Sequence, residues 1–181
     1  MRRLHTKPRQ TENKTYLYSD DMLSEAIDEL VKSVKIDRKY DIPYVAGYNN
    51  AGNVVYIDKD IPHFYRYKGE RYAVDKYLVV HEIVEKVFED TLKLNYFYAH
   101  QIALQVERKA VEADGLDWDA YDQYMQQWIK EVAHEKIQKV PADLDLQPYK
   151  DGKDWKLIDH MRDKMKTEVK EMAFIKELNS L

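Results

Sequence analysis

In the segment 76–90, KYLVVHEIVEKVFED, one histidine and two of the three glutamates have a spacing suited to metal chemistry. His81 and Glu85 are four residues apart, so a helix would place them on one face, one turn apart. An imidazole nitrogen and a carboxylate oxygen both bind Zn²⁺ at about 2.0–2.2 Å. Glu82 would lie at the flank of that face, where a carboxylate next to a ligand can act as general base toward water. The pattern therefore predicts two metal ligands and a base on one helix.

A third ligand is expected from the residues that follow a short connection at 93–95. His100 would lie near the start of a second helix, and so short a connection makes the two helices antiparallel neighbours. His81, Glu85 and His100 then form a His₂Glu set, a composition found in catalytic zinc sites. Glu107 lies two turns after His100 on the same face. It is either an acceptor for an imidazole N–H or an alternative ligand.

Two simpler interpretations of His81 remain open. It could be a structural histidine whose hydrogen bonds are satisfied inside the core, or it could belong to a solvated polar stripe. The helix around it is apolar over most of its circumference, which predicts burial. Buried ionisable groups are costly unless they are paired, hydrogen-bonded or bound to metal. A metal site is therefore the favoured interpretation.

The elements that must position these residues follow from hydrophobic periodicity and capping signals. Five helices are expected, at 19–36, 74–92, 96–113, 117–140 and 155–181. A β-hairpin is expected from two β-prone runs, 44–48 and 54–57, on either side of the turn signal NNAGN. The segment HFYRYKGERYAVDKY (63–77) is expected to be a loop, with a short extra turn around Lys68 and Gly69.

This order predicts an α+β fold that is mainly helical, with a small antiparallel hairpin packed on the helices. Three parts are expected: a flexible basic arm at 1–18, one domain at 19–140, and a linker with a charged helix at 141–181. The apolar stripe of that last helix suits packing on the domain and binding of a protein partner equally well.

Composition excludes several classes of protein. The chain has 181 residues and no cysteine, so any metal must be held by histidine and carboxylates. A net charge of −4 argues against nucleic-acid binding, although MRRLHTKPRQ is basic and HFYRYKGERY mixes basic with aromatic residues. No apolar run is long enough to cross a membrane. A cytoplasmic location is the expectation.

A hairpin followed by LVVHEIVE and then YAHQIALQVE resembles the core of zincin-like metallopeptidases, and bacterial and phage-encoded members most of all. The resemblance covers about residues 42–125 and implies a zincin-like core. It also implies a metal-dependent hydrolase, a peptidase using Zn²⁺ or another divalent metal, with Glu82 as the catalytic base. A peptide or protein substrate would pair with the strand in NVVYIDKDIP (53–62). Glu85 departs from the histidine that zinc peptidases of this type carry at that position.

The alternative function is a non-catalytic structural or adaptor protein on the same scaffold, and a phage particle is one setting for it. The C-terminal helix and the basic arm would then be docking elements. If the chain is phage-encoded, the expected location is the host cytoplasm or the virion.

Overall fold

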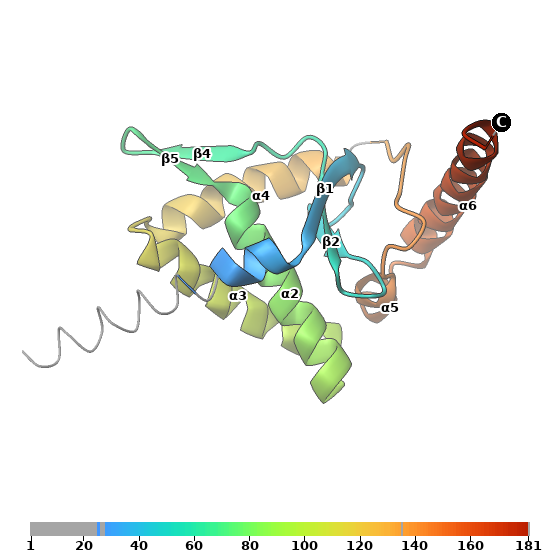
Figure 1. The fold of residues 1–181 in the computed structure, drawn as a ribbon. Coiled ribbons are helices and arrows are strands. Elements are labelled where there is room, and N and C mark those ends of the chain that lie inside the picture. Colours follow the sequence, from blue (N-terminus) through green and yellow to red (C-terminus); the bar gives the residue numbers. More distant parts are fainter. Residues whose placement is uncertain (1–24, 26–27, 135, 181) are drawn as a thin grey trace, which may run out of the picture.

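The computed structural model describes residue 25 and residues 28–134 and 136–180. The expected arm at 1–18 and the start of the first expected helix lie outside the described residues. The fold is α+β, with a three-stranded sheet and a two-stranded hairpin packed on helices (Figure 1). The predicted fold class is confirmed, while the zincin-like core stays a prediction.

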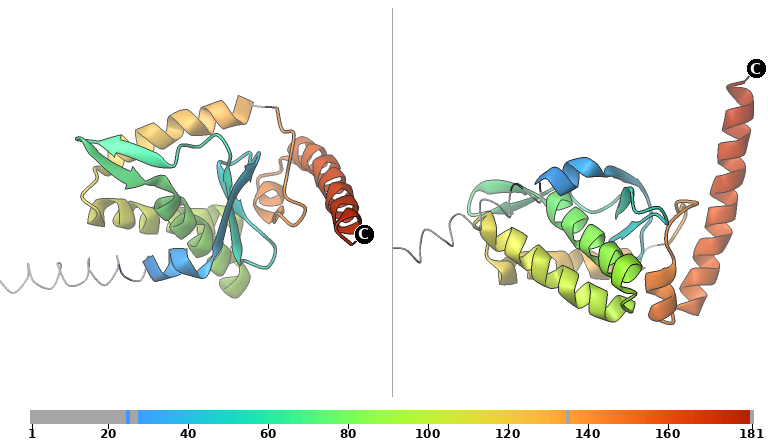
Figure 2. Two further views of the ribbon diagram at one scale, coloured as in Figure 1. Left: turned by 45° about the horizontal axis from the view of Figure 1, so that its top comes forward. Right: turned by 60° about the horizontal axis from the view of Figure 1, so that its bottom comes forward.

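Two helices that carry the candidate site match their predicted bounds. Helix α2 runs from Val74 to Leu92, and helix α3 runs from Tyr96 to Ala113. The side chain of Asn95 accepts a hydrogen bond from the backbone N–H of Phe97, which caps α3. Lys93 adopts the left-handed conformation after α2, with φ of 54°, and this reverses the chain within three residues. The two helices lie side by side (Figures 1 and 2).

The three-stranded sheet has the order β1-β3-β2. Its strands are β1 (Lys35–Tyr40), β2 (Ala46–Tyr48) and β3 (Val54–Asp58). The antiparallel pairing of β2 with β3 confirms the predicted hairpin. Strand β1 was not predicted, and the expected helix ends at residue 33 instead of 36. β1 is a charged edge strand, parallel to β3, so its sequence lacks the apolar alternation that identifies a strand.

The central position of β3 bears on substrate binding. It pairs with β1 on one side and with β2 on the other, so both of its edges are occupied. A peptide cannot add to a strand whose backbone groups are already paired. The expectation that the strand in 53–62 would bind substrate by strand addition is therefore wrong.

A second hairpin replaces the loop expected at 63–77. Strand β4 (Phe64–Tyr67) pairs antiparallel with β5 (Glu70–Ala73). Lys68 and Gly69 form the two-residue turn with φ of 49° and 91°, and two positive φ values are the signature of a type I′ turn. The predicted extra turn is thus correct, and the loop around it is wrong.

Helix α4 (Trp118–His134) is shorter than the range 117–140 that its periodicity predicted. Residues 136–140 are not helical. Instead the backbone N–H groups of Gln138 and Lys139 both donate to the Asp41 carboxylate at 2.7 Å, and the Lys139 carbonyl accepts from the Asp41 N–H. This contact with the loop after β1 competes with the last helical turns, and local periodicity cannot reveal it.

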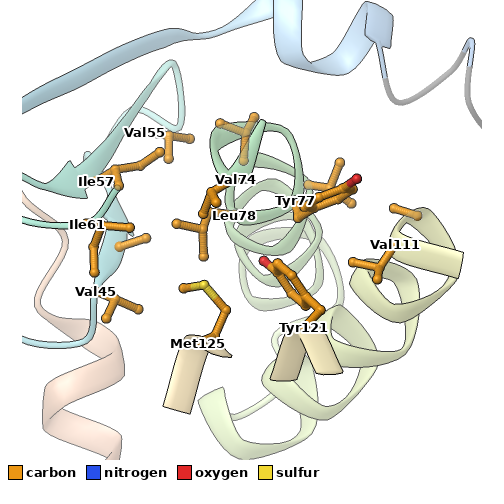
Figure 3. Close-up of a cluster of buried hydrophobic side chains, with 14 of the residues drawn as sticks. Val45, Val55, Ile57, Ile61, Val74, Tyr77, Leu78, Val111, Tyr121 and Met125 are labelled. Carbon is orange, nitrogen blue, oxygen red and sulfur yellow. The ribbon is translucent and has the colours of Figure 1, made fainter. Parts of the chain in front are cut away.

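The larger hydrophobic core lies between the sheet and helices α2, α3 and α4. Figure 3 shows Leu78 of α2 facing Ile57 and Ile61, with Met125 and Tyr121 of α4 beside it. Helix α2 is therefore buried on two sides, as its nearly all-apolar surface predicted. Burial on this scale fixes the orientation of the helix that carries His81.

A second core covers the other face of the sheet. It joins Tyr40 and Tyr56 of the sheet and Ile42 of the loop after β1 to residues of the C-terminal segment, namely Val140, Leu144, Tyr149, Ile158 and Met161. The expected linker at 141–154 contains a short helix, α5 (Gln147–Asp151). The C-terminal segment is thus packed on the sheet, and the boundary expected at residue 140 falls inside this shared core.

Helix α6 (Trp155–Leu178) packs on the domain at its start and extends away from it at its end (Figure 2). Ile158 and Met161 are fully buried, and the Glu168 carboxylate accepts a hydrogen bond from the Tyr40 hydroxyl. The apolar residues beyond this point are more than half exposed: Val169, Met172, Phe174, Ile175 and Leu178. Among the described residues, no helix combines the length and the apolar character needed to cross a membrane.

Candidate metal centre

Three of the predicted ligands converge between α2 and α3. The atoms that meet are His81 Nε2, Glu85 Oε2 and His100 Nδ1. His100 Nδ1 lies 3.0 Å from each of the other two, which are 3.6 Å apart. The side chains of His81 and Glu85 are buried, and that of His100 is about one third exposed. Among the described residues this is the one group of histidines and carboxylates close enough to hold a metal ion.

The spacing of these atoms fits a divalent ion. A circle through three points separated by 3.0, 3.0 and 3.6 Å has a radius of about 1.9 Å, slightly less than the Zn²⁺ bond length of about 2.0–2.1 Å to such donors. A point at bonding distance from all three atoms therefore exists just off their plane. Tetrahedral ligands at that bond length are about 3.3 Å apart, close to the mean of the three separations.

Glu107 lies on the other side of the His81 ring from the three converging atoms. Its Oε2 is 2.8 Å from His81 Nδ1, and its Oε1 accepts a hydrogen bond of 2.9 Å from the Tyr121 hydroxyl. A carboxylate at Nδ1 holds the proton there and leaves the Nε2 lone pair free for a metal. Of the two roles expected for Glu107, the geometry fits the acceptor of an imidazole N–H, and Tyr121 of α4 holds that acceptor in turn.

Tyr48 of β2 contacts Glu85 from the sheet side. Its hydroxyl is 3.3 Å from Glu85 Oε1 and 3.0 Å from Glu89 Oε2. A hydroxyl carries one proton, so it donates to one carboxylate at a time. Glu85 Oε2 thus faces His100 while Oε1 faces the sheet, and the carboxylate is fixed between two elements.

Glu82 is buried, and no hydrogen bond joins it to any of the described residues. It lines the same cavity as His81, Glu85 and His100. Burial, followed by the charge of Glu85, raises the pKa of Glu82 well above its usual range. A bound dication would oppose this shift, because it favours the ionised carboxylate. Glu82 is therefore a carboxylate whose oxygens are available to a ligand in the cavity.

The cavity next to these residues has a volume of about 260 Å³. Its walls come from β2, α2, α3, α4 and α5. Apolar and aromatic side chains form most of the lining, including Leu78, Leu104, Trp118, Met125 and Ile129. A mostly apolar cavity with a few polar groups at one end is typical of a ligand-binding site.

The protonation of His81 couples the centre to pH. Burial disfavours the charged imidazole, but hydrogen bonds with Glu107 and Glu85 outweigh it and raise the pKa of His81 well above its usual value. The pKa of Glu85 is lowered: burial opposes its ionised form, and the hydrogen bonds with His100 and His81 prevail. Without metal, the His81 ring is thus protonated on both nitrogens and lies between two carboxylates. A metal must displace the proton on Nε2 to bind there.

Glu89 gives a prediction about stability. Burial, together with the charges of Glu85 and Asp145, raises the pKa of Glu89 to about 7, although its hydrogen bond with Tyr48 opposes the shift. Between its unfolded pKa of about 4.3 and 7, the folded state binds more protons than the unfolded state, so stability falls as the pH rises. Glu89→Gln should reduce this loss and stabilise the metal-free protein by about 1–3 kcal/mol at pH 8.

Urea unfolding of the metal-free protein at pH 5 and at pH 8 measures this effect. Glu112→Gln is the matched control, because Glu112 is exposed and pairs with Arg108 on the surface of α3. Equal pH dependence of the free energy of unfolding in wild type and Glu89→Gln would contradict the prediction.

Sequence reasoning missed three tyrosines of this centre: Tyr48, Tyr121 and Tyr149. They come from β2, α4 and α5, and all three line the cavity. Fifteen tyrosines are spread along the chain, so their number alone does not mark these three. Tyr121 lies in a periodic apolar pattern with Met125, which predicts burial next to α2 or α3 but no contact with Glu107.

Comparison with known proteins adds no relative: no family model, curated protein or solved structure matches the chain.

Proposed function

We propose that the chain is a metal-dependent hydrolase that cleaves peptide bonds, with a divalent ion held by His81, Glu85 and His100. One observation carries this proposal. Three donor atoms meet at bonding distance from a common point, next to a cavity that Glu82 also lines. Two imidazole nitrogens and one carboxylate oxygen favour Zn²⁺ among the common divalent ions.

The chemistry follows from the roles of the side chains. A divalent ion at the common point would polarise a substrate carbonyl and lower the pKa of a water molecule. Glu82 would accept a proton from that water as its oxygen attacks the carbonyl carbon. The same proton then passes to the leaving nitrogen as the peptide bond breaks, so one water is consumed for each bond. Glu107 would keep His81 oriented throughout, because it binds the opposite ring nitrogen.

Metal binding tests the proposal directly. Protein stripped with a chelator and titrated with Zn²⁺ should bind one ion per chain. The affinity should fall as the pH is lowered, because His81 holds a proton that the ion must displace. Isothermal titration calorimetry in two buffers of different ionisation enthalpy measures both the stoichiometry and the proton release. A protein that binds no divalent ion after reconstitution overturns the proposal.

The alternative is a structural or adaptor protein that binds a protein partner. The observation that favours it is the exposed apolar end of α6, which extends away from the domain (Figure 2). Deleting residues 169–181 leaves the buried part of α6 intact. If the full chain self-associates or binds a partner and this truncated chain does not, and neither binds metal, the adaptor function replaces the hydrolase.

A further inference from the structure

Tyr149 of α5 has a buried hydroxyl with no hydrogen-bond partner among the described residues. Such groups are rare, because leaving a buried donor unpaired costs roughly 1–3 kcal/mol. The residue lines the cavity of the candidate metal centre, together with His81, Glu82 and His100. An unpaired donor at this place indicates that a ligand in the cavity is its partner.

The ring of Tyr149 is held firmly in position. It packs against the ring of Tyr44, with the centroids 4.4 Å apart. Helix α5 is tied to the start of α3, because the backbone N–H of Tyr96 and the side chain of Asn95 both donate to Asp151. Because Tyr149 is fixed from both sides, its hydroxyl keeps one place relative to His100 on α3.

Among the described residues, three other tyrosine hydroxyls around the cavity already have a hydrogen-bond partner within the protein, unlike the hydroxyl of Tyr149. The hydroxyls of Tyr44, Tyr48 and Tyr121 each donate to a carboxylate of the protein. Burial, followed by the charge of Glu82, raises the pKa of Tyr149 well above its usual value, so the hydroxyl keeps its proton and acts as a donor. Glu82 is the complementary case, an acceptor without a partner among the described residues. The cavity therefore offers Glu82 as an acceptor and the buried hydroxyl of Tyr149 as a donor, whereas Tyr96, which also lines it, is only partly buried.

We propose that Tyr149 donates a hydrogen bond to the carbonyl oxygen of the substrate as that oxygen gains negative charge. The inference rests on the proposed function, and it makes the C-terminal segment part of the active site. A donor placed where charge develops stabilises the transition state more than the ground state. Glu82 then accepts the proton of the water, and Tyr149 donates to the carbonyl oxygen of the peptide bond that is cleaved.

The experiment compares wild type with Tyr149→Phe, using acetohydroxamate as the probe on protein loaded with Co²⁺. Acetohydroxamate presents a carbonyl oxygen and a hydroxamate oxygen to a metal, and Co²⁺ reports its binding by visible absorption. Removing a hydrogen bond to a charged oxygen should weaken probe binding by about 10–100-fold. Affinity for Co²⁺ itself should not change, because the Tyr149 hydroxyl makes no hydrogen bond with His81, Glu85 or His100.

Thermal unfolding supplies a second measurement. Tyr149→Phe should unfold at the same temperature as wild type or a higher one, because its hydroxyl has no protein partner to lose. Tyr121→Phe, which breaks the hydrogen bond to Glu107, should unfold at a lower temperature. Tyr96→Phe tests the alternative donor, since Tyr96 lines the same cavity. Tyr98→Phe is the control for the probe, since Tyr98 is exposed on α3 outside the cavity and its loss should leave probe binding unchanged.

The outcomes separate the two proposals. If Co²⁺ binds and the probe binds wild type and Tyr149→Phe equally, or does not bind wild type, the role of Tyr149 is overturned and the metal site stands. A large loss in Tyr96→Phe with none in Tyr149→Phe also overturns it. A lower unfolding temperature for Tyr149→Phe would show that the hydroxyl has a partner within the protein. Failure of wild type to bind any divalent ion overturns both proposals.

Discussion

Replacing Glu82 with glutamine should leave metal binding intact and reduce peptide hydrolysis by about 10²–10⁴-fold, the usual contribution of a general base. Glutamine has nearly the same shape and can still occupy the buried position, but it cannot accept a proton from water. Glu82 makes no hydrogen bond with the described residues, so the substitution breaks no contact of that kind. It also removes a charge whose burial is unfavourable, so the fold should not be destabilised.

Fluorescently labelled casein, a mixed source of peptide bonds, serves as the substrate, and elemental analysis of the same samples gives the metal content. Glu112→Gln on the exposed surface of α3 is the control and should keep full activity. Wild-type activity in Glu82→Gln would exclude Glu82 as the base. Loss of the metal together with activity would instead assign Glu82 to the ligand set.

The second large effect is expected for His81→Ala, which should lose metal binding. It removes one of three donors, and it leaves Glu107 and Glu85 facing each other without the imidazole between them. Metal affinity should fall by more than the roughly 10–100-fold cost of losing an outer partner such as Glu107. Glu107→Gln should therefore bind metal more weakly than wild type and more tightly than His81→Ala.

Folding could confuse this result, since His81 is buried and its removal leaves two buried carboxylates unpaired. His100→Ala avoids the difficulty, because His100 is about one third exposed and its loss should disturb the core less. Circular dichroism checks the fold of each variant before metal titration. His63→Ala, an exposed histidine outside the centre, should bind one ion like wild type. Retention of wild-type affinity in a folded His100→Ala would exclude the three-ligand site.

The helices of the centre could be predicted from sequence because their signals are local. The bounds of α2 and α3 follow from apolar periodicity, the Asn95 cap and the short connection between them. The same signals place His81, Glu85 and His100 on facing surfaces. The three candidate ligands lie on two helices that are adjacent in sequence. Their convergence depends only on the packing of these two helices, so it too could be predicted.

Features that depend on distant partners could not be predicted in this way. Strand β1 exists because it pairs with β3, and its charged residues look like a helix surface when read alone. The early end of α4 depends on Asp41, nearly a hundred residues earlier. Strands β4 and β5 were missed for another reason: their turn has the Gly of a two-residue hairpin, but its partner Lys68 is an unusual residue at positive φ.

The hydrogen bonds that support the centre also come from elements other than α2 and α3. Tyr121 reaches Glu107 from α4, and Tyr48 reaches Glu85 from the sheet. Each contact needs the three-dimensional arrangement of elements that no local pattern specifies. The candidate ligands and Glu107 could thus be named from sequence, whereas the tyrosines that hold the carboxylates required the structure.

The candidate ligands His81, Glu85 and His100 all lie within one helical hairpin, and this has a consequence for how the chain folds. A metal ion bound to them would close only a short loop, which costs little conformational entropy. Contacts between residues near in sequence form early, before a sheet with parallel strands is assembled. An ion captured by α2 and α3 would therefore order this hairpin first, and the sheet, α4 and the C-terminal segment would assemble around an already occupied centre.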